Sequence, residues 1–151
     1  MSKSVLKLGS VLGLALLGTS TGAIAAPKPQ IVHINLTDAT TDPTIKQMVM
    51  KSDQESIKSG PVTFMVTNDS KSLVHEMIVV LVTEPKAELP YDAKKDEVIE
   101  SKIKHLGEAS DLPPGTNKSL RLNLKPGNYL LICNQPGHYH QGMWTTLTVA
   151  K

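Results

Sequence analysis

The sequence predicts an all-β domain, an antiparallel β-sandwich, and two observations carry that prediction. Short segments that alternate apolar and polar residues recur along the chain, and this period of two is typical of half-buried strands. Glycine, proline and asparagine clusters stand between these segments, where turns are expected. Six or more short strands joined by turns indicate a β-sandwich.

The first 25 residues are predicted to be a cleaved signal peptide and not part of the fold. Lys3 and Lys7 precede an apolar run at residues 8–17, and Ala23 and Ala25 supply the small residues that signal peptidase requires. An uncleaved membrane anchor is the alternative, but the run falls well short of the roughly 20 residues of a spanning helix. We therefore expect export to the periplasm, no stable membrane insertion, and a single domain over residues 26–151.

Three strands are expected in the first half of that domain. Residues 31–36 alternate apolar and polar positions, and residues 61–67 run from a Gly-Pro breaker to an Asn-Asp-Ser turn. Residues 73–83 are apolar on both faces, which predicts a central strand. Residues 42–58 are compatible with a helix or with a short strand.

The second half is expected to contain one charged excursion and three further strands. The excursion covers residues 84–115, and residues 93–106 can form an amphipathic helix through Val98, Ile99 and Ile103. Residues 120–124 alternate, and Pro126-Gly127 is expected to turn the chain into residues 129–133, giving a hairpin. Residues 143–150 form the last strand.

Charge and cysteine content exclude several classes of protein. Without the signal peptide, 14 basic and 14 acidic residues remain, because the first 25 residues hold two lysines and no acidic residue. No basic stripe is present, so nucleic acid is not an expected partner. Cys133 is the only cysteine. An unpaired cysteine in an exported protein indicates an intermolecular bridge, a reactive thiol or a metal ligand.

The neighbours of Cys133 favour the metal. Cys133, His138 and Met143 follow the spacing Cys-x4-His-x4-Met, and His75 lies far upstream in the apolar segment 73–82. One thiolate, two imidazoles and a thioether are the ligand set of a type 1 copper site. Each residue alone has a simpler explanation: an inert buried thiol for Cys133, core packing for Met143, and a satisfied core histidine for His75. The combination favours copper.

The remaining histidines are expected at the surface. His140 competes with His138 for the metal, but the Cys-x4-His spacing and the Pro136-Gly137 turn favour His138. The alternative for His33 and His105 is a weak accessory copper-loading site.

These segments resemble the cupredoxins, the group of plastocyanin, azurin and rusticyanin. The resemblance runs from about Gly60 to the end, through Gly60-Pro-Val-Thr-Phe-Met-Val-Thr-Asn68, His75-Glu-Met-Ile-Val and Pro126-Gly-Asn-Tyr-Leu-Leu-Ile-Cys133 to Met143. It implies a Greek-key sandwich with one type 1 copper ion, blue or green, cycling between Cu(I) and Cu(II). Glu76 stands where many cupredoxins carry an asparagine that braces the cysteine loop, so the brace is either lost or rebuilt by Asn68.

The function expected from this resemblance is one-electron transport in the periplasm, without enzyme activity. Its partners would be redox proteins such as a cytochrome or a membrane oxidase or reductase, and the chain is expected to be a monomer. The alternative is a periplasmic copper-binding protein for copper tolerance or sequestration. A thiol hydrolase would use Cys133 without Met143, and a copper nitrite reductase would need a second domain.

Overall fold

The computed structural model describes residues 27–38 and 48–151, so the expected signal peptide lies outside the described residues. Strands dominate the described part of the chain, and its one helix is a 3-10 helix of three residues. The elements, in chain order, are β1 (Gln30–Thr37), β2 (Val49–Ser52), β3 (Ser56–Lys58), β4 (Gly60–Asn68), β5 (His75–Val82), β6 (Tyr91–Asp92), β7 (Glu97–Val98), η1 (Glu100–Lys102), β8 (Lys104–Leu112), β9 (Asn117–Leu124), β10 (Gly127–Ile132) and β11 (Trp144–Ala150).

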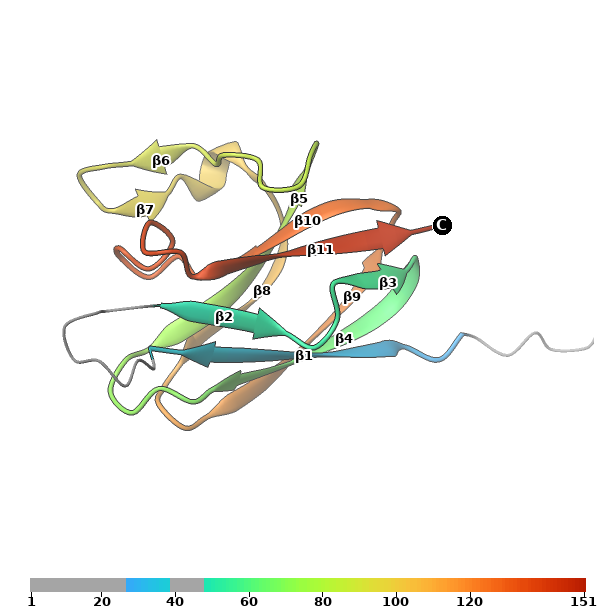
Figure 1. Ribbon diagram of the computed structural model, residues 1–151, viewed down its shortest axis with the longest axis horizontal. Helices are drawn as coiled ribbons and strands as arrows, with labels where there is room; N and C mark the ends of the chain where they lie inside the picture. Colours follow the sequence, from blue (N-terminus) through green and yellow to red (C-terminus); the bar gives the residue numbers. More distant parts are fainter. Residues whose placement is uncertain (1–26, 39–47) are drawn as a thin grey trace, which may run out of the picture.

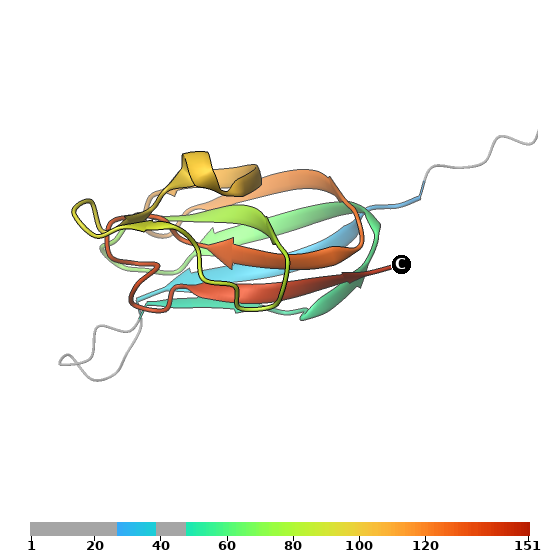
Figure 2. The same ribbon diagram turned by 90° about the horizontal axis from the view of Figure 1, so that it is seen from above.

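Two sheets face each other, which confirms the predicted sandwich (Figures 1 and 2). The first sheet has the strand order β2-β1-β4-β9, and the second has the order β3-β11-β10-β5-β8. Most neighbours are antiparallel, but β1 pairs with β4 in parallel and β3 pairs with β11 in parallel. These two pairs depart from the antiparallel arrangement expected for the sandwich, because alternation fixes the faces of a strand and not its partner.

The core lies between the two sheets and follows the period of two. Alternate residues of β1 point inward, and Val32, Ile34 and Leu36 are buried there. Phe64 of β4 is fully buried in the same apolar cluster. β5 is an interior strand of the second sheet, as the doubly apolar segment predicted, and its residue Met77 faces this core.

The opposite face of the second sheet is also buried, beneath the charged excursion. Ile78, Val80, Leu130 and Ile132 form a second apolar cluster with Val98. Figure 1 shows β6, β7 and the 3-10 helix on the side of β10 and β11 that faces away from β1 and β4.

The helix expected over residues 93–106 was wrong. This segment contains the end of a β6–β7 hairpin, the three-residue 3-10 helix and the start of β8. Asp96 closes the hairpin at a φ of 61°, a conformation that aspartate tolerates better than most residues. Val98 and Ile103, which looked like one face of a helix, instead cover the outer face of the sheet.

Two further expectations differ from the structure. β9 pairs with β4 in the first sheet, whereas β10 pairs with β5 and β11 in the second, so the Pro126-Gly127 turn joins the two sheets and makes no hairpin. Residues 48–58 form β2 and β3 and no helix, while residues 42–47 lie outside the described residues. Within residues 27–38 and 48–151, no helix has the length and apolar character needed to cross a membrane.

Candidate metal centre

His75 is the first residue of β5 and is fully buried. The strand lies between β10 and β8, so its backbone is held from both sides. Alternation places His75 on the same face as Met77 and Val79, and both of these belong to the central core. The sheet therefore holds the His75 imidazole in a fixed direction at one end of the sandwich.

Cys133 directly follows β10 and opens a loop that ends at Met143, just before β11. Two backbone hydrogen bonds close this loop: Cys133 N donates to Met143 O, and Met143 N donates to His138 O, both at 3.0 Å. Gly137 has a φ of 81°, and His138 N donates to Gln135 O at 2.9 Å, so the loop folds back on itself. His138 thereby returns toward Cys133.

Three donor atoms converge at this end of the sandwich. His75 Nδ1 and His138 Nδ1 lie 3.2 Å apart, while Cys133 Sγ lies 4.0 Å from the first and 3.4 Å from the second. The centre of this triangle is about 2.1 Å from each atom, and metal–nitrogen and metal–sulfur bonds of zinc are about 2.0–2.3 Å long. The three atoms therefore fit a metal ion of that size.

Met143 is fully buried in the same apolar cluster as Cys133. Its position at the closing end of the loop follows from the two backbone hydrogen bonds that it makes to Cys133 and His138. A thioether is a weak ligand, and in copper sites of this type it occupies a long axial position. The thiol, the two imidazoles and the buried thioether are thus the kinds of donor that a copper site of this type uses.

Burial keeps the three donors uncharged in the absence of a cation. Burial, and next the neighbouring His138, lower the pKa of His75 to about 4, and burial also lowers the pKa of His138. Burial raises the pKa of the Cys133 thiol to about 12. His75 Nε2 is buried without a hydrogen-bond partner among the described residues. A cation at the centre of the triangle would satisfy the converging lone pairs and ionise the thiol.

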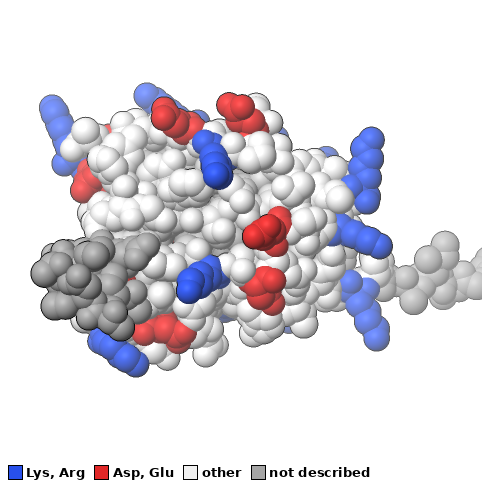
Figure 3. Space-filling view, viewed as in Figure 1, with Lys and Arg blue, Asp and Glu red and all other residues white. Residues whose placement is uncertain are grey.

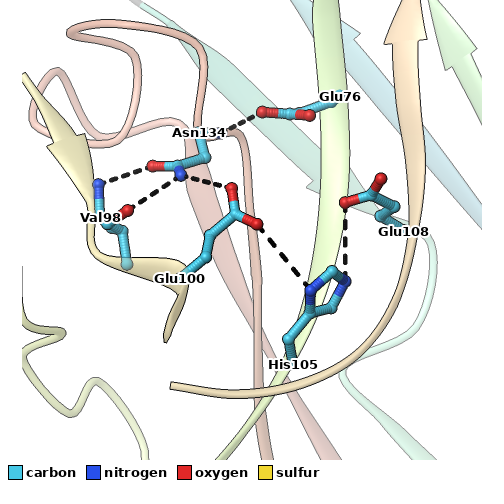
Figure 4. Close-up of polar contacts among 6 residues, drawn as sticks. All are labelled: Glu76, Val98, Glu100, His105, Glu108 and Asn134. Atoms are coloured by element: carbon cyan, nitrogen blue, oxygen red, sulfur yellow. Dashed lines mark hydrogen bonds and ion pairs between the residues drawn. The ribbon is translucent and has the colours of Figure 1, made fainter. Parts of the chain in front are cut away.

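Glu76 provides the brace that its position in the sequence placed in doubt. Its backbone N–H points to Cys133 Sγ at 3.4 Å, and its carboxylate accepts a hydrogen bond from Asn134 N at 3.2 Å (Figure 4). Burial, and next the carboxylates of Glu108 and Glu100, raise the pKa of Glu76 to about 7. The Asn68 side chain instead donates to the carbonyls of Leu73 and Leu112.

The other histidines lie away from the triangle. The side chain of His140 is 76% exposed and lies 3.8 Å from Asp96, whereas His138 is buried. His33 is exposed on β1. His105 lies between Glu100 and Glu108, at 3.9 and 3.6 Å, on the outer side of the second sheet (Figure 4).

Sequence reasoning missed Asn134, Glu100 and Glu108, which surround the brace (Figure 4). Asn134 is separated from its partners Val98 and Glu100 by more than 30 positions. No local spacing rule connects such residues. The one available signal was the position of Asn134 directly after Cys133.

Comparisons with known proteins identify a family and a shared fold. Residues 57–151 match the family described as the Sulfocyanin (SoxE) domain. No curated protein matches the chain by sequence.

Similar solved structures include a dithionite-reduced auracyanin from the photosynthetic bacterium Roseiflexus castenholzii. It is 19% identical to this chain, with a TM-score of 0.56, and the match covers 82% of this chain and 98% of the auracyanin. Rusticyanin from Thiobacillus ferrooxidans is 16% identical with a TM-score of 0.57, over 82% of this chain and 79% of its own. An azurin from Methylomonas sp. strain J is 14% identical with a TM-score of 0.56, over 81% and 98%. At these identities the likeness shows a shared fold.

Proposed function

The chain belongs to the Sulfocyanin (SoxE) domain family and is a cupredoxin, and from this membership we propose that it carries single electrons in the periplasm. Its cofactor is one type 1 copper ion. We propose that His75, Cys133 and His138 would hold the ion, with Met143 as a fourth, weaker donor. The observation that carries this proposal is the buried triangle of two imidazole nitrogens and one sulfur around a common centre.

Copper supplies a site that gains or loses one electron as it alternates between Cu(I) and Cu(II). The protein supplies a fixed set of donors, because His75 is held in an interior strand and the other three lie on a loop closed by backbone hydrogen bonds. Burial of His75, Cys133 and Met143 excludes water from the centre. A rigid, dry site requires little rearrangement when the charge changes, which favours fast transfer.

His138 is the proposed route for the electron. It is the one member of the ligand set that keeps some exposure, 8%, while the other three are at 0%. A partner that docks on the loop around His138 would reach the site through this imidazole. We propose redox proteins such as a cytochrome or a membrane oxidase or reductase as partners, and a monomeric carrier.

The surface is compatible with brief encounters. On the face seen in Figure 3, acidic and basic side chains are interspersed over the middle and the top, while basic side chains gather along the right-hand edge. Transient redox complexes use small interfaces, so that partners exchange rapidly. The proposed role includes no enzyme activity and rests on export by the predicted signal peptide, residues 1–25.

The experiment is to load the periplasmic protein with copper, record its visible spectrum and midpoint potential, and measure electron self-exchange. The zinc-loaded protein is the matched control, because zinc has no redox chemistry. We expect an intense colour that reduction bleaches, together with fast self-exchange. A colourless copper complex would contradict the proposal. Cleavage of the signal peptide is tested separately, by mass spectrometry of the purified chain, which should show a start at Ala26.

The alternative role in copper tolerance depends on extra copper ligands. Methionines 48, 50 and 77 are buried in the core and are not available as surface ligands. Met65 is 36% exposed and stands alone on β4. Copper sensitivity after deletion of the gene, with slow self-exchange of the pure protein, would favour tolerance over electron transport.

A further inference from the structure

Asn134 joins the copper-ligand loop to the outer excursion. It follows Cys133 directly and is buried, and its side chain points toward β7 on the outer side of the second sheet (Figure 4). Its Oδ1 accepts a hydrogen bond from Val98 N at 2.7 Å, and its Nδ2 donates to Val98 O at 3.1 Å. The same Nδ2 donates to Glu100 Oε1 at 2.9 Å.

This contact uses the full chemistry of an amide. A primary amide offers two N–H donors and one carbonyl acceptor, and here both donors and the acceptor are engaged. The pair of bonds to Val98 copies the way in which a neighbouring strand would pair with β7. An aspartate has no N–H donors for Val98 O and Glu100. An alanine has neither the donors nor the acceptor.

The main chain of Asn134 is held from the opposite side. Asn134 N donates to the Glu76 carboxylate, and Glu76 N points to Cys133 Sγ. The residue after the proposed thiolate ligand is therefore fixed through its backbone by β5 and through its side chain by β7 and Glu100. Rotation about the bonds between Cys133 and Asn134, which would move the sulfur, is opposed from both directions.

A second contact ties the same loop to the same hairpin. Gly137 N donates to Asp96 O at 2.7 Å, one residue before His138. Glycine is favoured at position 137 by its φ of 81°, since a Cβ there would meet only the side-chain ends of Asp96 and Gln141, each at 3.0 Å. Tyr139 adds an aromatic contact to Tyr91 of β6, with ring centroids 6.2 Å apart.

We infer that Asn134 is a positioning residue, which transmits the placement of the β6–β7 hairpin to the copper-ligand loop and so tunes the copper site. The inference rests on the proposed function, since it concerns the same site. Docking of the excursion does not itself depend on Asn134, because Val98 and Ile103 belong to the outer apolar cluster together with Ile78 and Val80. Asn134 instead fixes the position of the hairpin relative to the loop.

The test compares Asn134→Asp and Asn134→Ala with the wild-type protein, and Asn123→Asp on the exposed face of β9 is the matched control. We expect both Asn134 variants to shift the visible charge-transfer bands and to lose copper affinity by roughly 10- to 100-fold, as is usual when an outer partner of a ligand is removed. The added negative charge of Asn134→Asp should also lower the midpoint potential, because it favours Cu(II). Asn123→Asp should match the wild type.

Hydrogen exchange on the copper-free variants gives an independent readout. The Val98 amide should exchange faster in Asn134→Ala, while the amides of β10 keep their protection. A lower melting temperature combined with wild-type spectrum, potential and copper affinity would show a purely structural role and overturn the inference. If an Asn134 variant does not fold, Glu100→Ala removes one of the three bonds, and an unchanged spectrum and affinity there would also overturn it.

The inference and the proposed function fail in different ways. A wild-type protein without a coloured copper site refutes the function, whatever the variants do. A coloured wild type whose Asn134 variants are indistinguishable from it refutes only the positioning role.

Discussion

Copper binding to the copper-free protein should release one proton, and it should come from Cys133. Burial raises the pKa of this thiol to about 12, so it is protonated at neutral pH, whereas the metal ligand is the thiolate. The two imidazoles release none, because burial lowers the pKa of His75 to about 4 and also lowers that of His138. Both are neutral ligands above pH 6.5.

The loss of copper affinity follows from the difference between the pKa of Cys133 and the working pH. At pH 7 only about one molecule in 10⁵ has the thiolate, so the apparent copper affinity should be about 10⁵-fold below that of the ionised site. A raised pKa means that the copper-free protein holds the proton. Each rise of one pH unit should therefore increase the affinity about tenfold over the range from about 8 to 10, which lies above the pKa of about 7 to which Glu76 is raised.

The assay is a Cu(I) competition titration against a coloured chelator at several pH values within that range. A plot of the logarithm of the affinity against pH should have a slope of one, and His140→Ala should give the same slope as the wild type. A slope near zero would mean that Cys133 is already ionised in the copper-free protein. A slope of two or more would mean that a second group, a buried imidazole or Glu76, also releases a proton in this range, and either result would refute the reasoning.

Five substitutions test the ligand assignments. Cys133→Ser should abolish the intense visible absorption of the copper-loaded protein, and equal colour in the variant would contradict the site. In a copper titration, His138→Ala should lose the coloured site and His140→Ala should keep it. The reason is that, of these two histidines, only His138 lies within 3.4 Å of Cys133 Sγ. The reverse result would exchange their roles. Met143→Gln should lower the midpoint potential, since an oxygen donor favours Cu(II), and Met143→Leu should raise it; voltammetry that shows no shift in either would reduce Met143 to a packing residue.

Local patterns predicted the strands well where alternation and turn residues agree. β4 runs from the Gly60-Pro61 breaker to Asn68, and β5 was recognised as an interior strand because both of its faces are apolar. The pairing of the strands was harder to predict from the sequence. The parallel β1–β4 pair and the separation of β9 from β10 depend on contacts between distant segments, about which a period of two carries no information.

The excursion shows how an apolar pattern can have two readings. Val98 and Ile103 are spaced like one face of a helix, but each packs on the outer face of the second sheet from a short, irregular segment. β8 was hidden for another reason, because Gly107 and several charged residues lower its strand propensity. It forms at the edge of the sheet through its pairing with β5.

The candidate ligands were easier to predict than their surroundings. Cys133, His138 and Met143 lie within eleven residues, so one turn-containing loop brings them together, and His75 completes the set of donors from a distant apolar segment. Asn134 and Glu100 are 34 positions apart and meet only because the hairpin folds over the sheet. The assignment of the proposed ligands thus depends mainly on local spacing, whereas the contacts that fix their positions join distant segments.

The distribution of the ligands over the two sheets explains why the excursion matters. Three proposed ligands lie at strand ends of the second sheet: His75 at the start of β5, Cys133 after β10 and Met143 before β11. His138 lies in the loop between β10 and β11, and the first sheet supplies no ligand. The second sheet is buried on both faces, by the central core on one side and by the excursion on the other. A strand held on one face alone could tilt and carry a ligand with it. Packing on both faces therefore opposes the movements that would raise the cost of electron transfer, and the Asn134 contact extends that restraint from the strands to the loop itself.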